Sequence, residues 1–590
     1  MAPPLNENHR TTSDTNAVSS GLPRADTRAF AWSRLSALAL LLQLFGASGI
    51  ASASPPVLEG LQAPSQVPRG LVLVQGTNLG KARIIWDANS PNPKVLHGAV
   101  QGAVMFSIPP GVSPGSYAVA IENDEGRSSP VTMTITGAAP AALPRIDDIS
   151  LLDTRFDDGG RVRCVLYIQG ANVDVGATVL VDGVERTSDA HKALFNNMFG
   201  ANPAVLGFPI RHYLSRVVPL DSFPAGSEIR VQLRNELGEL SLERIFKLPL
   251  DASSLDSDGD GIPDVVEING YLGSEPGSTL VDIKALGADP FRKDIFVEAD
   301  VMEGVLYRPI ERLGATPGTF DIAREMFANA PILNPFGPNG INLFVDSSGS
   351  VPSWELLEFR SRHDLATRTA SFALLKQDHF SPSRRGLFHY AIWARAHPLG
   401  WSGESNIDFD GSKVGNDFMV TLGDAPVQYQ TLKSQAATFA HELGHNLGQR
   451  HGGTNHSRFK PNYWSVMSYA WQLRMSQADA FRRRYPTCTP VYYATDGAEE
   501  VDGTVPQVAG FVIDYSEGIG PELAPNAGSL NEQVGVCGSP IDWNKNGVID
   551  SQYVTAVIDE DEPAATKVTD HPNWPNLRFD GPRLGGRVTP

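Results

Sequence analysis

The sequence predicts a multidomain protein in which two all-β sandwiches are followed by an α+β domain. Three observations lead to this prediction. The chain of 590 residues is too long for one compact core. Residues 54–137 and 143–250 each contain short alternating segments separated by turns rich in Gly, Pro and Asn. From residue 288 onward, strand-like and helix-like apolar patterns follow one another instead.

The composition is that of an ordinary globular protein. Hydrophobic residues make up 41% of the chain and charged residues 19%, which argues against a disordered or fibrous protein. The formal net charge is −18. Because phosphate backbones attract Lys and Arg, this acidic balance argues against a nucleic-acid partner.

Residues 1–53 are predicted to be a signal peptide. Arginines precede the apolar run of residues 35–45, and Ala51-Ser52-Ala53 forms a suitable cleavage site. An uncleaved membrane anchor is the alternative, because the run and its tail could almost span a bilayer. Gln43 and the small residues after the run favour cleavage. We therefore expect a secreted or cell-surface protein with no membrane span after signal removal.

The chain contains three cysteines, too few for a disulfide framework. Cys488 and Cys537 could pair in an oxidising compartment. Cys164 lies in "VRCVLYI", where every second residue is apolar, so we expect it to be buried in a strand.

The two predicted sandwiches share turn motifs. "VQGTNLG" at Val74 recurs as "IQGANVD" at Ile168, and "PGSYAVAIENDEG" at Pro114 is echoed by "AGSEIRVQLRNELG" at Ala225. Repeated turns at matching points indicate two copies of one antiparallel unit. The first copy resembles the IPT/TIG immunoglobulin-like domain, and the second is a weaker match. Such domains usually serve as spacers or adhesion modules, which implies an adhesion ligand as one partner.

The predicted linker, residues 251–287, contains an EF-hand-like calcium loop, "DSDGDGIPDVVE". Calcium prefers about six to eight hard oxygen ligands, and Gly261 permits the sharp turn that wraps them around one ion. The predicted ligands at positions 1, 3, 5, 7, 9 and 12 are Asp256, Asp258, Asp260, Ile262 through its carbonyl, Asp264 and Glu267. A solvated acidic linker is the alternative, but its carboxylates would repel one another without a cation.

A second loop, "DWNKNGVIDSQY", lies in the C-terminal segment, residues 537–590. It begins in the same register, with candidate ligands Asp542, Asn544, Asn546 and Asp550. Its twelfth residue is Tyr553, which cannot bind calcium through two carboxylate oxygens. The start resembles a dockerin-type calcium loop, and an Asx-rich turn is the alternative.

Residues 288–536 are predicted to form the α+β domain. The segments "KDIFVEADVM", "INLFVDS", "HYAIWARA" and "DFMVTLG" are expected to be strands, and "TFDIAREMFAN" a helix. A second helix is predicted over residues 431–448. Its apolar residues are spaced to bury one side: Leu432, Ala436, Phe439, Leu443 and Leu447.

This second helix contains "HELGHNLGQRH", whose histidines have the spacing of metal ligands. His441 and His445 are four residues apart, so their imidazoles lie on one helix face. Gly448 can end the helix so that His451 closes the site from a loop. Three nitrogen ligands with one position left for water describe a catalytic zinc, whereas structural zinc sites usually have four protein ligands.

The pattern is specific. With 13 histidines and 66 acidic residues in the chain, His-acid-x-x-His is expected by chance about 0.03 times. Adding the glycine and the third histidine lowers this to below about 0.0001. Three surface histidines at an ordinary helix end are therefore a poor explanation.

The run from His441 to His451 matches the metzincin signature H-E-x-x-H-x-x-G-x-x-H. Downstream, "NYWSVMSYAWQ" is similar to the family's Met-turn, with Met467 in the place of the methionine beneath the zinc. The resemblance implies a zinc endopeptidase acting on proteins or peptides, with Glu442 as general base. It also implies that Tyr469 binds zinc or supports the transition state. Gly452 does not indicate a branch of the family.

Two other functions stay open at this point. The sandwiches are compatible with an adhesion or matrix-binding protein whose metzincin domain is inactive, although Glu442 and all three histidines are intact. A metallohydrolase acting on something other than peptides is the second alternative, and the Met-turn disfavours it.

Overall fold

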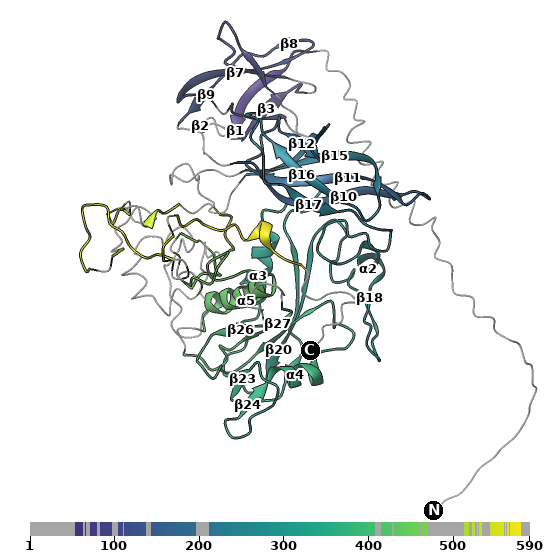
Figure 1. Cartoon of the computed structure of the whole chain (residues 1–590), viewed down its shortest axis with the longest axis vertical. Coiled ribbons are helices and arrows are strands. Elements are labelled where there is room, and N and C mark those ends of the chain that lie inside the picture. Colours follow the sequence, from purple (N-terminus) through teal and green to yellow (C-terminus); the bar gives the residue numbers. More distant parts are fainter. Residues whose placement is uncertain are drawn as a thin grey trace, which may run out of the picture. The chain divides into compact units, whose positions relative to one another are not determined.

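Two pairs of β-sheets lie between residues 57 and 247 of the computed structural model (Figure 1). The structure describes residues 54–579, except for 63–64, 67–70, 80–82, 97–103, 110, 137–142, 196–211, 315, 407–414, 427–429, 459, 461, 464, 470–471, 473–512, 519–521, 526–527, 529, 534–542, 545, 560, 562 and 566. The predicted signal peptide, Cys488, Cys537 and Asp542 lie outside these residues. Among the described helices, none is both long and apolar enough to cross a membrane.

The first pair of sheets shares one core. A three-stranded sheet has the order β1-β3-β6, and a second sheet has the order β2-β9-β7-β4-β5, with β8 paired to β7. Buried side chains of both sheets, such as Phe106 and Ile121, belong to the same cluster. The strands are β1 (Val57–Gln62), β2 (Ser65–Gln66), β3 (Leu71–Thr77), β4 (Arg83–Trp86), β5 (Lys94–Leu96), β6 (Val104–Ser107), β7 (Gly115–Asn123), β8 (Gly126–Arg127) and β9 (Val131–Ile135).

The second pair is antiparallel throughout, with orders β10-β11-β15-β14 and β13-β12-β16-β17. Inward side chains of both sheets again form one core. Cys164 is buried in this core, as predicted. The strands are β10 (Arg145–Phe156), β11 (Arg161–Ala171), β12 (Thr178–Val181), β13 (Val184–Arg186), β14 (Asp189–Phe195), β15 (His212–Pro224), β16 (Glu228–Arg234) and β17 (Arg244–Lys247). The prediction of a β-rich, multi-sheet chain is confirmed.

The following residues contain a sheet of order β21-β20-β25-β27-β26, in which β22 also pairs with β20. All pairs in it are parallel except that of β26 with β27. Parallel strands are usually covered on both faces. Accordingly, Val297 of β20 packs in the core beneath α3 and α5, and Phe296 packs in the core that contains α4 residues.

The elements after the second sandwich are α2 (Asp264–Asn269), β18 (Tyr271–Leu272), β19 (Leu280–Val281), β20 (Asp294–Met302), α3 (Thr319–Ala328), β21 (Asn342–Asp346), β22 (Ser350–Val351), β23 (Leu356–Glu358), β24 (Thr369–Ser371), α4 (Phe372–His379), β25 (His389–Trp393), β26 (Gly403–Ser405), β27 (Asp417–Val420), α5 (Leu432–Asn446) and η4 (Trp574–Asn576). The four strands and two helices predicted in this region are present. The short edge strand β26 was not predicted.

Helix α5 positions the histidines. It begins after Thr431, whose hydroxyl accepts a hydrogen bond from the Ser434 amide at 3.0 Å and so caps the helix. Phe439 packs against Phe320 of α3 and Phe418 of β27, with ring centroids 5.1 and 5.4 Å away. The apolar face is therefore buried on the sheet, as the spacing predicted.

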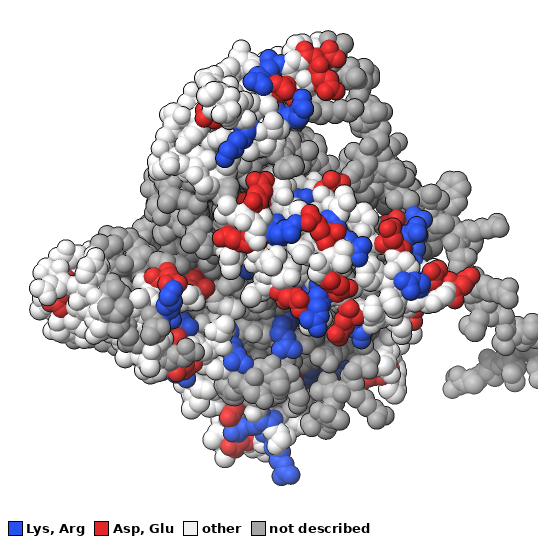
Figure 2. Space-filling model, turned by 45° about the horizontal axis from the view of Figure 1, so that its top comes forward, with Lys and Arg blue, Asp and Glu red and all other residues white. Residues whose placement is uncertain are grey.

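Residues near the C-terminal end of the described chain contribute to the same core. The Tyr515 hydroxyl donates to the Ala440 carbonyl of α5 at 2.6 Å. The ring of Trp574 packs edge-on against that of Phe327 of α3, and the two ring centroids are 5.6 Å apart. These residues thus belong to the core that contains α3 and α5. The face shown in Figure 2 carries acidic and basic side chains interspersed with one another.

Candidate functional site

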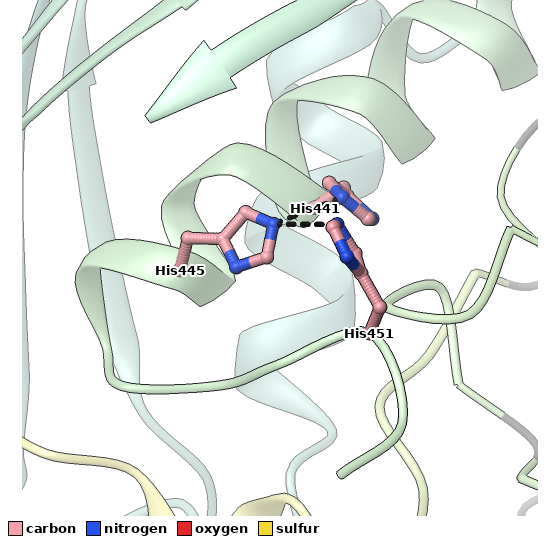
Figure 3. A group of neighbouring side chains, drawn as sticks. All are labelled: His441, His445 and His451. Carbon is pink, nitrogen blue, oxygen red and sulfur yellow. Dashed lines mark hydrogen bonds between the residues drawn. The ribbon is translucent and has the colours of Figure 1, made fainter. Parts of the chain in front are cut away.

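The three histidines of the signature converge on one point. His441 and His445 project from α5, and His451 reaches them from the following loop (Figure 3). The Nε2 atom of His445 lies 3.1 Å from Nε2 of His441 and 3.1 Å from Nε2 of His451. All three ligand atoms lie close enough together to bind one metal ion.

The outer nitrogens of two rings are fixed by backbone carbonyls. Nδ1 of His441 donates to the Val466 carbonyl and Nδ1 of His445 to the Gln449 carbonyl, each at 2.8 Å. Because a carbonyl can only accept, Nδ1 carries the proton in both rings and Nε2 presents a lone pair. Lone pairs 3.1 Å apart repel one another unless a cation lies between them. This donor arrangement fits a metal ion.

Burial keeps these imidazoles neutral. Desolvation lowers the pKa of His445 to about 4 and that of His441 well below its usual value. The pKa of His451 is also lowered, first by burial and then by the neighbouring imidazoles. Neutral imidazole is the form that binds metals, so the site is ready to bind a metal at neutral pH.

Gly448 makes the turn that brings His451 to the site. Its φ of 82° lies in the left-handed region that side chains with a Cβ resist. The Gly448 amide donates to the His445 carbonyl, and the Gln449 amide to the Gly444 carbonyl, both at 2.9 Å. These bonds close the helix end in the way glycine-terminated helices do. A glycine with positive φ is therefore present at the end of α5.

The segment predicted to be a Met-turn lies directly against α5. The Val466 carbonyl holds His441, and Met467 next to it is fully buried. A Cβ atom added to Gly444 would lie 2.4 Å from Sδ of Met467, so this glycine is what allows the sulfur to approach the helix turn between the two histidines. Met467 thus lies against the turn of α5 that joins His441 to His445.

Tyr469 also faces the site. Its ring centroid is 4.4 Å from that of His451 and 5.6 Å from that of His441. Burial, followed by the charge of Glu442, raises the pKa of Tyr469 to about 12. The phenol is therefore protonated at neutral pH and can donate a hydrogen bond.

Glu442 follows His441 on α5 and is buried. Burial raises its pKa well above the usual value, and the nearby Glu404 adds to the shift. A divalent cation held by the adjacent imidazoles would favour the carboxylate form. A Cβ on Gly403 of β26 would lie only 2.6 Å from Oε1 of Glu442. The edge strand therefore borders the candidate general base, a contact that the sequence did not indicate.

A second cluster of candidate ligands lies in the predicted calcium loop. Asp256, Asp258 and Asp260 bring carboxylate oxygens together, and Asp260 does so again with Glu267 and Asp294. Asp294 is the first residue of β20. The sequence did not indicate it, because it lies outside the twelve-residue motif and a single acidic residue at the start of a strand gives no signal.

Asp264 hydrogen-bonds to another residue of the same loop. Its Oδ1 accepts from the Ser257 amide at 2.7 Å, and its Oδ2 from the Ser257 hydroxyl at 2.8 Å. Asp264 is absent from both carboxylate groups that gather in the described residues. It is the first residue of α2, and its carboxylate stabilises the loop by accepting these two hydrogen bonds.

Burial and like charge raise the pKa values in this cluster. The pKa of Glu267 rises to about 11 and that of Asp294 to about 7, in both cases chiefly through burial. Asp258 and Asp260 shift well upward for the same reason, with neighbouring carboxylates as the next cause. A bound cation would favour the ionised form of these carboxyl groups.

The described part of the second loop is held by hydrogen bonds among its own side chains. The side-chain amides of Asn544 and Asn546 both donate from Nδ2 to Oδ2 of Asp550 at 3.0 Å. Glu532, fully buried, accepts from the Trp543 amide at 2.9 Å and the Asp550 amide at 2.7 Å. Asp542 lies outside the described residues. The calcium loop and the Asx-rich turn both stay predictions for this segment.

Comparisons with known proteins give little further information. No family model and no curated protein matches the chain. A gamma-CGTase from alkalophilic Bacillus clarkii is 12% identical, with a TM-score of 0.13, over 33% of this chain and 26% of that one. The SGBP-B protein of the Bacteroides ovatus mixed-linkage glucan utilization locus, in complex with a mixed-linkage heptasaccharide, is 15% identical, with a TM-score of 0.12, over 33% and 45%. The chain thus spans less than half the length of either protein, and TM-scores this low support no argument about function.

Proposed function

We propose that this protein is a secreted or cell-surface zinc endopeptidase of the metzincin type. The observation that carries the proposal is the convergence of three Nε2 atoms beside Glu442. His441, His445 and His451 would hold the zinc and leave one position for water. The buried Met467 and the Tyr469 ring next to the histidines support the metzincin assignment.

The residues around the histidines have distinct roles in this mechanism. Zinc supplies Lewis-acid activation of water and carbonyl groups at neutral pH when bound. Glu442 accepts the proton of the attacking water and then donates it to the leaving amine. The protonated Tyr469 phenol donates a hydrogen bond to the oxygen of the scissile carbonyl as negative charge develops there.

The edge strand β26 offers a place for a polypeptide substrate. It ends the order β21-β20-β25-β27-β26, so within the described residues one of its edges has no strand partner. An extended peptide can add to such an edge through backbone hydrogen bonds. Because Gly403 borders Glu442, a peptide paired there would pass beside the candidate general base. Trp401, which lies just before the strand and is 50% exposed, offers apolar surface to the side chains of such a peptide.

The N-terminal sandwiches support a second function. We propose that they are immunoglobulin-like modules that act as spacers or bind an adhesion ligand. A protein that used only these modules would be an adhesion protein with an inactive metzincin domain. The complete ligand set and the buried Glu442 favour the active enzyme over this alternative.

Removing the metal tests the proposed function. The purified mature protein should contain about one zinc per chain and should cleave casein. A zinc chelator should abolish cleavage, and added zinc should restore it. Elemental analysis and release of casein fragments are the measurements. A protein that contains no zinc and leaves casein intact after zinc is added would support the adhesion alternative.

Gly403→Ala tests the contact between the edge strand and Glu442. The new methyl group would lie 2.6 Å from Oε1 of Glu442 and 2.7 Å from the Met419 carbonyl, so the strand or the carboxylate has to move. Because misplacing a catalytic group by about 1 Å can cost ~100-fold in rate, we expect kcat to fall at least about 10-fold with unchanged zinc content.

Gly111→Ala is the matched control, since a Cβ there has open space around it and should leave kcat unchanged. Equal kcat values for the parent and the Gly403→Ala variant would show that β26 does not constrain Glu442.

A further inference from the structure

The acidic loop of residues 256–267 and the first strand of the following sheet meet at one carboxylate group. Asp260 belongs to the triad of the loop and also to the triad with Glu267 and Asp294. The Asp294 amide donates to Oδ2 of Asp260 at 2.7 Å. The beginning of β20 is therefore joined to the loop both by its backbone and by its side chain.

Several oxygens in this group are buried and receive no hydrogen bond. Glu267 is 1% exposed, and neither of its oxygens has a donor. Asp258 is also buried, and its Oδ2 has no hydrogen-bond donor either. Leaving a buried carboxylate oxygen without a donor costs free energy, which a bound cation would offset. These oxygens without donors indicate a bound cation, and this indication does not depend on the sequence motif.

The remaining oxygens are held in place by the loop itself. Asp256 accepts from the Gly259 and Gly261 amides at 2.7 and 2.9 Å, and Asp260 accepts from the Ile262 amide at 2.8 Å. A site made only of carboxylate and carbonyl oxygens suits a hard cation, and a large number of them suits calcium better than magnesium.

The loop also contacts the preceding sandwich. The Ser257 carbonyl accepts from the Leu151 amide of β10 at 2.7 Å. Lys293, which precedes β20, hydrogen-bonds the Asp258 carbonyl and lies 3.3 Å from Asp148 of β10. The loop is thus in direct contact with both the second sandwich and the start of β20.

We propose that Asp294 binds calcium together with Glu267 and the loop residues Asp256, Asp258 and Asp260, and that the ion fixes the start of β20 against the second sandwich. The sheet that begins with β20 is the one on which α5 and its histidines pack. Calcium therefore stabilises the scaffold of the candidate zinc site without taking part in its chemistry. The readouts below are calcium binding and unfolding, so they do not depend on the peptidase proposal.

Asp294→Asn tests the added ligand. Asparagine keeps an oxygen that can accept from the Asp289 amide but removes the negative charge. Calcium affinity of the full mature chain, measured by titration calorimetry, should fall at least about 10-fold. Glu267→Gln should lower it as well. Asp282→Asn is the matched control, because Asp282 is exposed and only accepts from the Ala285 amide at 3.1 Å.

The unfolding temperature provides a second readout, because the effect of the variant should differ between calcium-free and calcium-loaded protein. Without calcium, Asp294→Asn should unfold at the same temperature as the parent or higher, because one of several repelling carboxylates is gone. With calcium, the parent should gain more than the variant. In the parent itself, calcium should slow proteolysis around residues 251–293, while magnesium at the same concentration should not.

Calcium affinity of Asp294→Asn equal to that of Asp282→Asn and the parent would overturn the role of Asp294. A parent chain whose cleavage around residues 251–293 is unaffected by calcium would overturn the site as a whole.

Discussion

Glu442→Gln should lower the rate of peptide cleavage by at least about 10²–10⁴-fold while the zinc content stays at the level of the parent. Glutamine has nearly the same size as glutamate, which matters because Gly403 leaves no room for a larger group beside Oε1. It cannot accept the proton of the attacking water. Zinc is retained because the three imidazoles, and not Glu442, form the ligand group.

The measurements for this variant are zinc content by elemental analysis and kcat on a quenched fluorescent peptide. Glu325→Gln is the matched control, since it makes the same chemical change at an exposed position of α3 and should leave both values unchanged. Unchanged peptidase activity in Glu442→Gln would end the metzincin interpretation.

His445→Ala should lose zinc and activity together. Nε2 of His445 lies 3.1 Å from the Nε2 atoms of both other histidines, so its removal leaves two ligands on either side of a gap. Two imidazoles rarely retain zinc against a chelator, and we expect zinc content below about one tenth of the parent value after dialysis. Peptidase activity should fall in proportion.

His379→Ala, at an exposed position in the last turn of α4, is the control for the loss of an imidazole. The two variants should therefore differ. Glu442→Gln should retain zinc without activity, and His445→Ala should have neither zinc nor activity. A His445→Ala protein that retains a full zinc complement would show that the three histidines are not the ligand group.

Local patterns along the chain determined much of this structure. The strands β20, β21, β25 and β27 coincide with short apolar stretches of the sequence, and the helices α3 and α5 with apolar residues at helical spacing. The same holds for the metal-ligand spacing on α5, since residues four apart on a helix must share a face. Gly448 ended the helix where expected, because its positive φ is a local conformational requirement.

Contacts between distant segments could only be decided by the tertiary structure. Asp294 joins the acidic loop, Gly403 borders Glu442, and Val466 fixes the Nδ1 proton of His441. None of these pairs has a periodicity or spacing that a sequence can display, because each depends on how a strand or loop packs against another element. The contact of the Asp264 carboxylate with Ser257 also depends on how the loop folds back on the start of α2. Sequence thus determined which groups each element carries, and packing decided which of them meet.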